Sequence, residues 1–201
     1  MHSEWLKVVP WIIDAARMKA QEIERFRTSK QGCVRVCAYA KCDEAKAWFG
    51  GLGSFKNGVS DIADIEFAMP IVAGGSTIAV FVEDGKEIHV NTYAVTAMKI
   101  ADCSRAQHLD LPALSGLSYD ARQDNDTECG YGKWAGALCV RVNKRNNEGV
   151  WSEFCGIYIS VSGADEYDDL RVAKYATCVI KDFFRAEGDN FMIDIPDTYA
   201  P

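Results

Sequence analysis

The sequence predicts an α+β fold in which an antiparallel β-sheet is flanked by helices. Two pairs of β-branched segments are each joined by a short turn, which is typical of antiparallel hairpins, and longer stretches between them repeat apolar residues at helical spacing. The chain has 201 residues, of which 48% are hydrophobic and 25% charged, enough apolar material for one sizeable core. We therefore expect a single domain over residues 1–201.

Five segments are expected to be helical. They are Trp11–Arg27, Asp43–Phe49, Ser60–Met69, Thr92–Arg105 and Asp165–Ala186. Ser60 is a plausible cap for the third helix, and Pro70 would stop it. On the fourth helix, Val95 and Met98 belong to the apolar stripe, whereas Lys99 is expected to face the solvent.

Five segments are expected to be strands. They are Cys33–Ala40, Thr77–Val82, Glu87–Val90, Ala137–Val142 and Trp151–Val161. Asp84-Gly85 predicts a tight hairpin turn with positive φ at Gly85. Residues 1–70 are interpreted as a helical addition or a divergent first part, 71–188 as the core, and 189–201 as an extended tail. The long polar stretch from Gln107 to Gly136 predicts a functional loop or disorder.

Charge and cysteine content narrow the class of protein. The net charge of −7 argues against a nucleic-acid partner, because phosphate binding needs clustered Lys and Arg. The apolar patch Val8–Ile13 is too short to span a membrane and lacks a secretory cleavage site, so we expect a cytoplasmic protein. The eight cysteines are expected to be reduced and mostly buried as core thiols, with disulfides as the alternative. Cys33 and Cys37 would lie roughly 13 Å apart on one strand, which argues against a shared metal ion.

The stretch GIYISVSGADEYDD joins a buried strand directly to an acidic helix start. Gly163 permits a sharp turn, and the carboxylates that follow it place negative charge at the positive end of the helix dipole. Asp168 and Asp169 are expected on a solvated face. A helix start also binds anions, but these acids would repel a phosphate or a propionate.

If the chain has a ligand site, we expect it where this turn meets the long loop. Ser160, Ser162 and Gly163 would supply the turn, and Tyr131 and Trp134 would supply aromatic surface from the loop. The alternative is that the turn is only a helix entry and the loop only disordered.

The same turn resembles the C-terminal motif of the haem-degrading-domain superfamily, the GlcG- and HbpS-like proteins. GIYISVSGA and the acidic helix with Ala173 match that motif, TIAVFVEDGKEIHV is similar to the family's hairpin, and AMKIADCSRA is similar to its Lys-x-x-x-Ala helix. The resemblance covers Thr77 to Phe184, about half of the chain. The family's Gly-Gly-x-Pro segment appears here only as GYGKWAGAL, without the proline.

The resemblance implies an antiparallel sheet flanked by helices, related to profilin-like domains, and assembly into a homo-oligomer. It also implies a small ligand, with haem or another tetrapyrrole as the candidate cofactor. His89 is then an axial candidate, although a half-exposed strand histidine is the simpler interpretation. No nucleophile elbow or His-Glu-x-x-His motif indicates an enzyme, so catalysis stays uncertain. The alternative function is a scaffold or protein-interaction module without a small ligand.

Overall fold

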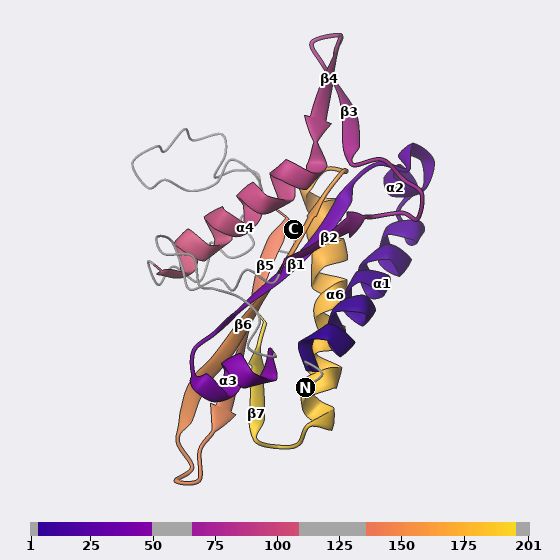
Figure 1. The fold of residues 1–201 in the computed structure, drawn as a ribbon. Coiled ribbons are helices and arrows are strands. Elements are labelled where there is room, and N and C mark those ends of the chain that lie inside the picture. Colours follow the sequence, from indigo (N-terminus) through magenta and orange to yellow (C-terminus); the bar gives the residue numbers. More distant parts are fainter. Residues whose placement is uncertain (1–3, 50–65, 109–135, 196–201) are drawn as a thin grey trace.

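The computed structural model describes residues 4–49, 66–108 and 136–195, and it confirms the α+β class. Its centre is a five-stranded antiparallel sheet with the strand order β2-β1-β6-β5-β7 (Figure 1). These strands are β1 (Cys33–Ala40), β2 (Glu66–Pro70), β5 (Ala137–Arg145), β6 (Trp151–Ser162) and β7 (Phe191–Asp194). Strands β1 and β6 pair in the interior of the sheet, so β1 belongs to the same core as the C-terminal strands.

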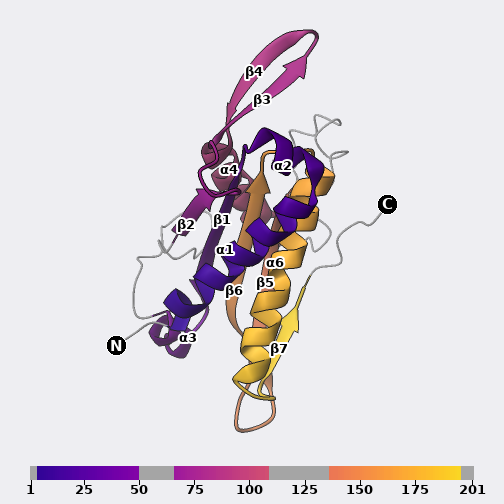
Figure 2. The ribbon, with the colours of Figure 1, turned by 90° about the vertical axis from the view of Figure 1, so that its right-hand side faces the viewer.

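Helices cover both faces of the sheet. The long helices α1 (Glu4–Glu22) and α6 (Glu166–Ala186) lie side by side on one face, and α4 (Thr92–His108) crosses the other (Figure 2). Two short helices, α2 (Glu24–Ser29) and α3 (Asp43–Trp48), follow α1 and β1. The three-layer arrangement buries a strand such as β1 on both faces, which explains why all of its residues are buried.

The two sheet faces have different chemistry. The larger core cluster joins α1 and α6 to side chains such as Val34, Val36, Ile157 and Ile159, and it is almost entirely aliphatic or aromatic. The smaller cluster, beneath α4, contains thiols and phenols; its members are Cys37, Tyr39, Ile100, Cys103, Ala137, Cys139 and Tyr158. Five of the seven described cysteines are buried, as expected from their apolar neighbours, whereas Cys42 and Cys178 are exposed.

The predicted hairpin is confirmed, and it stands apart from the main sheet. Strands β3 (Ile78–Glu83) and β4 (Lys86–Asn91) form a separate two-stranded sheet that projects from the body; we call residues 78–91 the arm (Figure 1). Asp84 and Gly85 have φ values of 51° and 74°, the conformation that the two-residue turn requires. At its base, the Thr92 N–H donates to the Thr77 carbonyl over 2.8 Å.

Two local predictions are wrong. Residues 66–70 of the expected Ser60–Met69 helix form β2, because they pair with β1 from Cys33 to Cys37 at the sheet edge; the preceding residues of that segment lie outside the described part. The first helix begins at Glu4, includes Pro10, and ends at Glu22 instead of continuing to Arg27. Its apolar stripe, which starts at Trp5, packs on α6 and outweighs the hydrogen bond lost at Pro10.

The remaining element predictions hold with small shifts at their ends, and the tail contributes the additional strand β7. No helix in the described ranges has the length and apolar character needed to cross a membrane.

A side chain at Gly163 would collide with backbone atoms. It has φ of 146°, and a Cβ there would lie 2.5 Å from the Gly32 Cα and 2.8 Å from the Gln31 carbonyl oxygen. Because backbone atoms are in the way, we expect Gly163→Ala to lower the free energy of unfolding by about 2 kcal/mol or more in urea denaturation. Gly188→Ala is the control, since Gly188 also has positive φ but no heavy atom within 4 Å. Equal losses for both variants would contradict the close approach.

Candidate functional site

A cleft of about 840 Å³ lies between the arm and the start of α6. The arm contributes the apolar residues Val80, Phe81, Val82, Ile88 and Val90. The opposite side consists of Ser162 at the end of β6, the following turn, and the first residues of α6; α4 contributes Val95 and Lys99. The volume falls within the range of about 300–1,000 Å³ that is common for small-molecule sites. We call this hollow the arm cleft.

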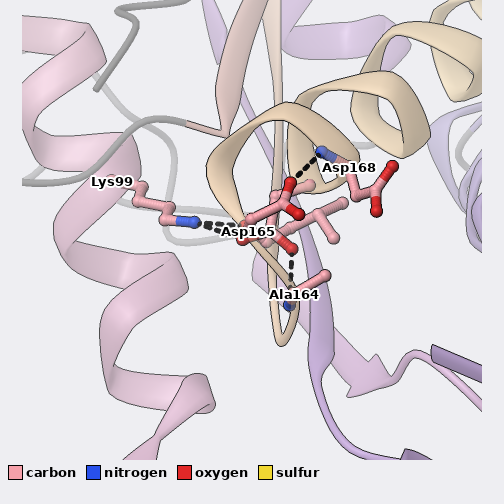
Figure 3. A network of polar contacts seen from close by, with 6 residues as sticks. Lys99, Ala164, Asp165 and Asp168 are labelled. Atoms are coloured by element: carbon pink, nitrogen blue, oxygen red, sulfur yellow. Dashed lines mark hydrogen bonds and ion pairs between the residues drawn. The ribbon is translucent and has the colours of Figure 1, made fainter. Parts of the chain in front are cut away.

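A buried ion pair adjoins the arm cleft. Lys99 extends from α4 toward the first turn of α6 (Figure 3), where its Nζ lies 2.9 Å from Asp169 Oδ2 and donates to the Val161 carbonyl oxygen over 2.7 Å. Asp169 Oδ1 accepts from the Ala164 N–H over 3.0 Å. Both side chains are only 3% exposed. A buried pair is tolerable only when its remaining polar atoms are also bonded, and this geometry meets that condition.

Two residues beside the pair shape its surroundings. Asp165 caps α6, since its Oδ1 accepts from the Asp168 N–H over 2.8 Å (Figure 3). Gly136, just before β5, leaves room for the ammonium group, because a Cβ there would lie 2.8 Å from Lys99 Nζ. Several segments distant in the sequence therefore converge at the end of β6.

The Asp169 carboxyl has an unusual proton affinity. Burial raises its pKa from 3.8 to about 6, although Lys99 and the Ala164 N–H both act to lower it. The carboxyl is therefore ionised at neutral pH but takes up a proton in mildly acidic solution.

A cation borders the cleft on the arm side. The Arg25 guanidinium of α2 lies 5.3 Å from the centroid of the Phe81 ring, within the range of a cation–π contact. The described lining thus has three carboxylates, Asp165, Glu166 and Asp169, and two cations, Arg25 and Lys99. With Lys99 neutralising Asp169, the rest of the lining is slightly acidic.

The residues predicted from the sequence separate in space. Ser162 lines the cleft, and Gly163 forms the turn beside it. Ser160 is fully buried under α4, where its Oγ has no hydrogen-bond partner among the described residues. His89 is on the arm face opposite Ile88 and Val90; its side chain is 63% exposed and its Nε2 lies 3.7 Å from Glu87 Oε2. Tyr131 and Trp134 lie outside the described residues.

The sequence interpretation missed the two charged residues that matter most. Lys99 and Asp169 were expected to face the solvent, and that expectation is wrong for both. The sequence contains one signal for Lys99: it lies four residues after Val95 and four before Cys103, so the three share one face of α4. The structure shows that this face is buried. A lysine within such a stripe indicates a buried acidic partner. The identity of that partner, 70 residues away, follows only from the fold.

Comparison of the chain with protein-family models, with curated proteins and with solved structures found no match. The resemblance to the haem-degrading-domain superfamily, including its profilin-like relationship, therefore stays a prediction.

Removing one member of the ion pair should be costly. Lys99→Met would leave the Asp169 carboxylate buried without its cation, and we expect the free energy of unfolding to fall by about 3–5 kcal/mol. The double variant Lys99→Met/Asp169→Leu should recover most of this loss, because it removes both charges. Urea denaturation measures both. Lys46→Met, which breaks the exposed Lys46–Asp43 pair, is the control and should cost less than about 1 kcal/mol. A loss of that size for Lys99→Met would contradict a dependence of the fold on the pair.

Asp169 should also give the stability a pH dependence. Because its pKa is higher in the folded chain than its ordinary 3.8, the folded state retains a proton that the unfolded state has released. The stabilisation from this proton is complete below pH 3.8 and is lost as the pH rises through about 6. We expect the difference in unfolding free energy between wild type and Asp169→Asn to change across this window. A constant difference would show that Asp169 does not titrate there.

Proposed function

We propose that this chain is a small-ligand-binding protein and that its site is the arm cleft. The observation that carries the proposal is the combination of an apolar wall, from Phe81, Ile88 and Val90, with fixed charges on the opposite side. Such sites hold a ligand by apolar contact and orient it with a few polar groups. The polar groups are already held in place, because the ion pair and the α6 cap fix Asp169 and Asp165.

The lining favours an apolar ligand that is neutral or positively charged. Of the described lining residues outside the ion pair, two are acidic, Asp165 and Glu166, and one is basic, Arg25. An anion that enters the cleft would lose hydration next to these carboxylates. Its binding is therefore disfavoured.

Haem does not fit the described lining well. None of the described lining side chains is a histidine, cysteine, methionine or tyrosine, the usual ligands of haem iron. The two propionates of a tetrapyrrole would also meet an acidic rim. The described lining therefore favours an apolar ligand other than haem.

The test uses two apolar fluorescent probes of different charge, neutral Nile red and anionic anilinonaphthalene sulfonate, with haemin as a third compound. We expect Nile red to bind more tightly than the anionic dye in fluorescence titrations. Val90→Trp should weaken Nile red binding by about tenfold or more, since the indole occupies cleft volume. Val150→Trp is the control, because Val150 is exposed in the β5–β6 turn and is not among the residues that line the cleft.

A second pair of variants separates the cleft from the other arm face. Ser162→Leu adds bulk inside the cleft and should weaken binding of the neutral probe, whereas His89→Ala should weaken it much less, because His89 is not among the residues that line the cleft. If His89→Ala abolished probe or haemin binding while Ser162→Leu had no effect, the ligand would bind outside the cleft. Absence of binding by all three compounds would favour the scaffold function.

A further inference from the structure

Among the described residues, no strand covers the outer edge of β4 along the arm. In the described part of the chain, β3 is the one strand that pairs with β4. The pairs Glu83–Lys86 and Phe81–Ile88 are the hydrogen-bonded ones, as follows from the two-residue turn. The N–H and C=O groups of Glu87 and His89 therefore point away from β3, toward the open edge. The edge of β3 is different, because the Val80 N–H donates to Gln31 Oε1 over 3.0 Å.

The arm also exposes three large apolar side chains. Ile78 is 40% exposed, Val82 73% and Ile88 38%. The arm extends away from the helices and the main sheet in both views (Figures 1 and 2). Two-stranded ribbons are only marginally stable in water, and an open strand edge with apolar side chains favours pairing with another strand.

We infer that a second copy of this chain pairs its β4 with β4 in antiparallel fashion, around a two-fold axis at Ile88. In this register Ile88 lies opposite Ile88 of the second copy, as a non-hydrogen-bonded pair with closely spaced side chains. Glu87 lies opposite His89 of the second copy, and the reverse pair follows by symmetry. The outward N–H and C=O groups of both residues thereby gain backbone partners.

Charge complementarity selects this register. Within one chain, Glu87 and His89 already lie on the same face with 3.7 Å between Oε2 and Nε2. A shift by one residue on each strand would place either Glu87 opposite Glu87 or His89 opposite His89. Like groups opposite each other destabilise a sheet, whereas the proposed register forms two Glu–His pairs.

The apolar side chains agree with the same arrangement. Phe81 lies opposite Ile88 within the arm. Pairing at Ile88 therefore creates a continuous row across four strands, Phe81, Ile88, then Ile88 and Phe81 of the second copy. Phe81 and Ile88 are both among the residues that line the arm cleft, so each copy extends this part of the apolar wall of the other. The inference does not depend on the proposed ligand, because self-association is measured without one.

The test is sedimentation velocity of the full chain over a concentration series. We expect a reversible dimer, and Ile88→Lys should raise its dissociation constant by at least about tenfold by placing two cations at the axis. Val82→Lys is the matched control, because Val82 belongs to β3 of the same arm, whereas the proposed contact joins the two β4 strands. A monomer at every concentration, or a dimer that Ile88→Lys leaves intact, overturns the inference.

A charge exchange tests the register even if Ile88→Lys perturbs the arm. Glu87→Lys should weaken the dimer by removing the carboxylate opposite His89 of the second copy, and His89→Glu by placing two carboxylates opposite each other, whereas the double variant should restore it. Ile88→Cys should form a disulfide-linked dimer on mild oxidation, and Val82→Cys should not, with the parent chain as the control for native thiols such as Cys42 and Cys178. Failure of the double variant to recover, together with no Ile88→Cys crosslink, contradicts this pairing.

Discussion

The buried contact between Lys99 and Asp169 is the constraint on which the geometry of this end of the molecule depends. Two charges at 3% exposure must satisfy each other and also find further partners, which here are the Val161 carbonyl and the Ala164 N–H. The contact therefore links α4 to the end of β6 and the start of α6. Because β4 runs directly into α4, the same link sets where the arm stands relative to α6. The arm cleft is the space that this link leaves between them.

The two faces of the sheet contribute to the fold in different ways. The face under α1 and α6 is apolar, so its burial is non-directional and stabilises without fixing one arrangement closely. The face under α4 includes Arg35, which is 2% exposed and donates to Thr96 Oγ1 over 3.1 Å and to the Tyr93 carbonyl over 2.7 Å. Such buried donors have few acceptable partners, so α4 has little freedom to slide. Stability thus comes mainly from one face, and the position of α4 comes from polar contacts on the other.

This division explains what the sequence could predict. Elements with their own periodicity, such as β1, the arm hairpin and α6, were predicted because the pattern lies within a few neighbouring residues. Strand β2 was missed, since five residues ending in Pro70 become a strand only through pairing with β1. The ion pair was missed for a similar reason: Lys99 and Asp169 are distant in the sequence, and each resembles an ordinary surface charge. The turn through Ser162 and Gly163 lies beside the cleft, whereas Ser160 two residues earlier faces α4.

The arm connects the two proposals physically. Ligand contact would use side chains that stand perpendicular to the ribbon, whereas self-association would use backbone groups in its plane, so one does not block the other. Ile88 belongs to both, because it lines the cleft and lies at the proposed two-fold axis. If a ligand packs against Ile88 more closely when the second copy supplies the adjoining row, ligand binding and dimerisation must strengthen each other by the same factor. The fraction of chains whose β4 is paired with a second copy would then be highest when the ligand is bound.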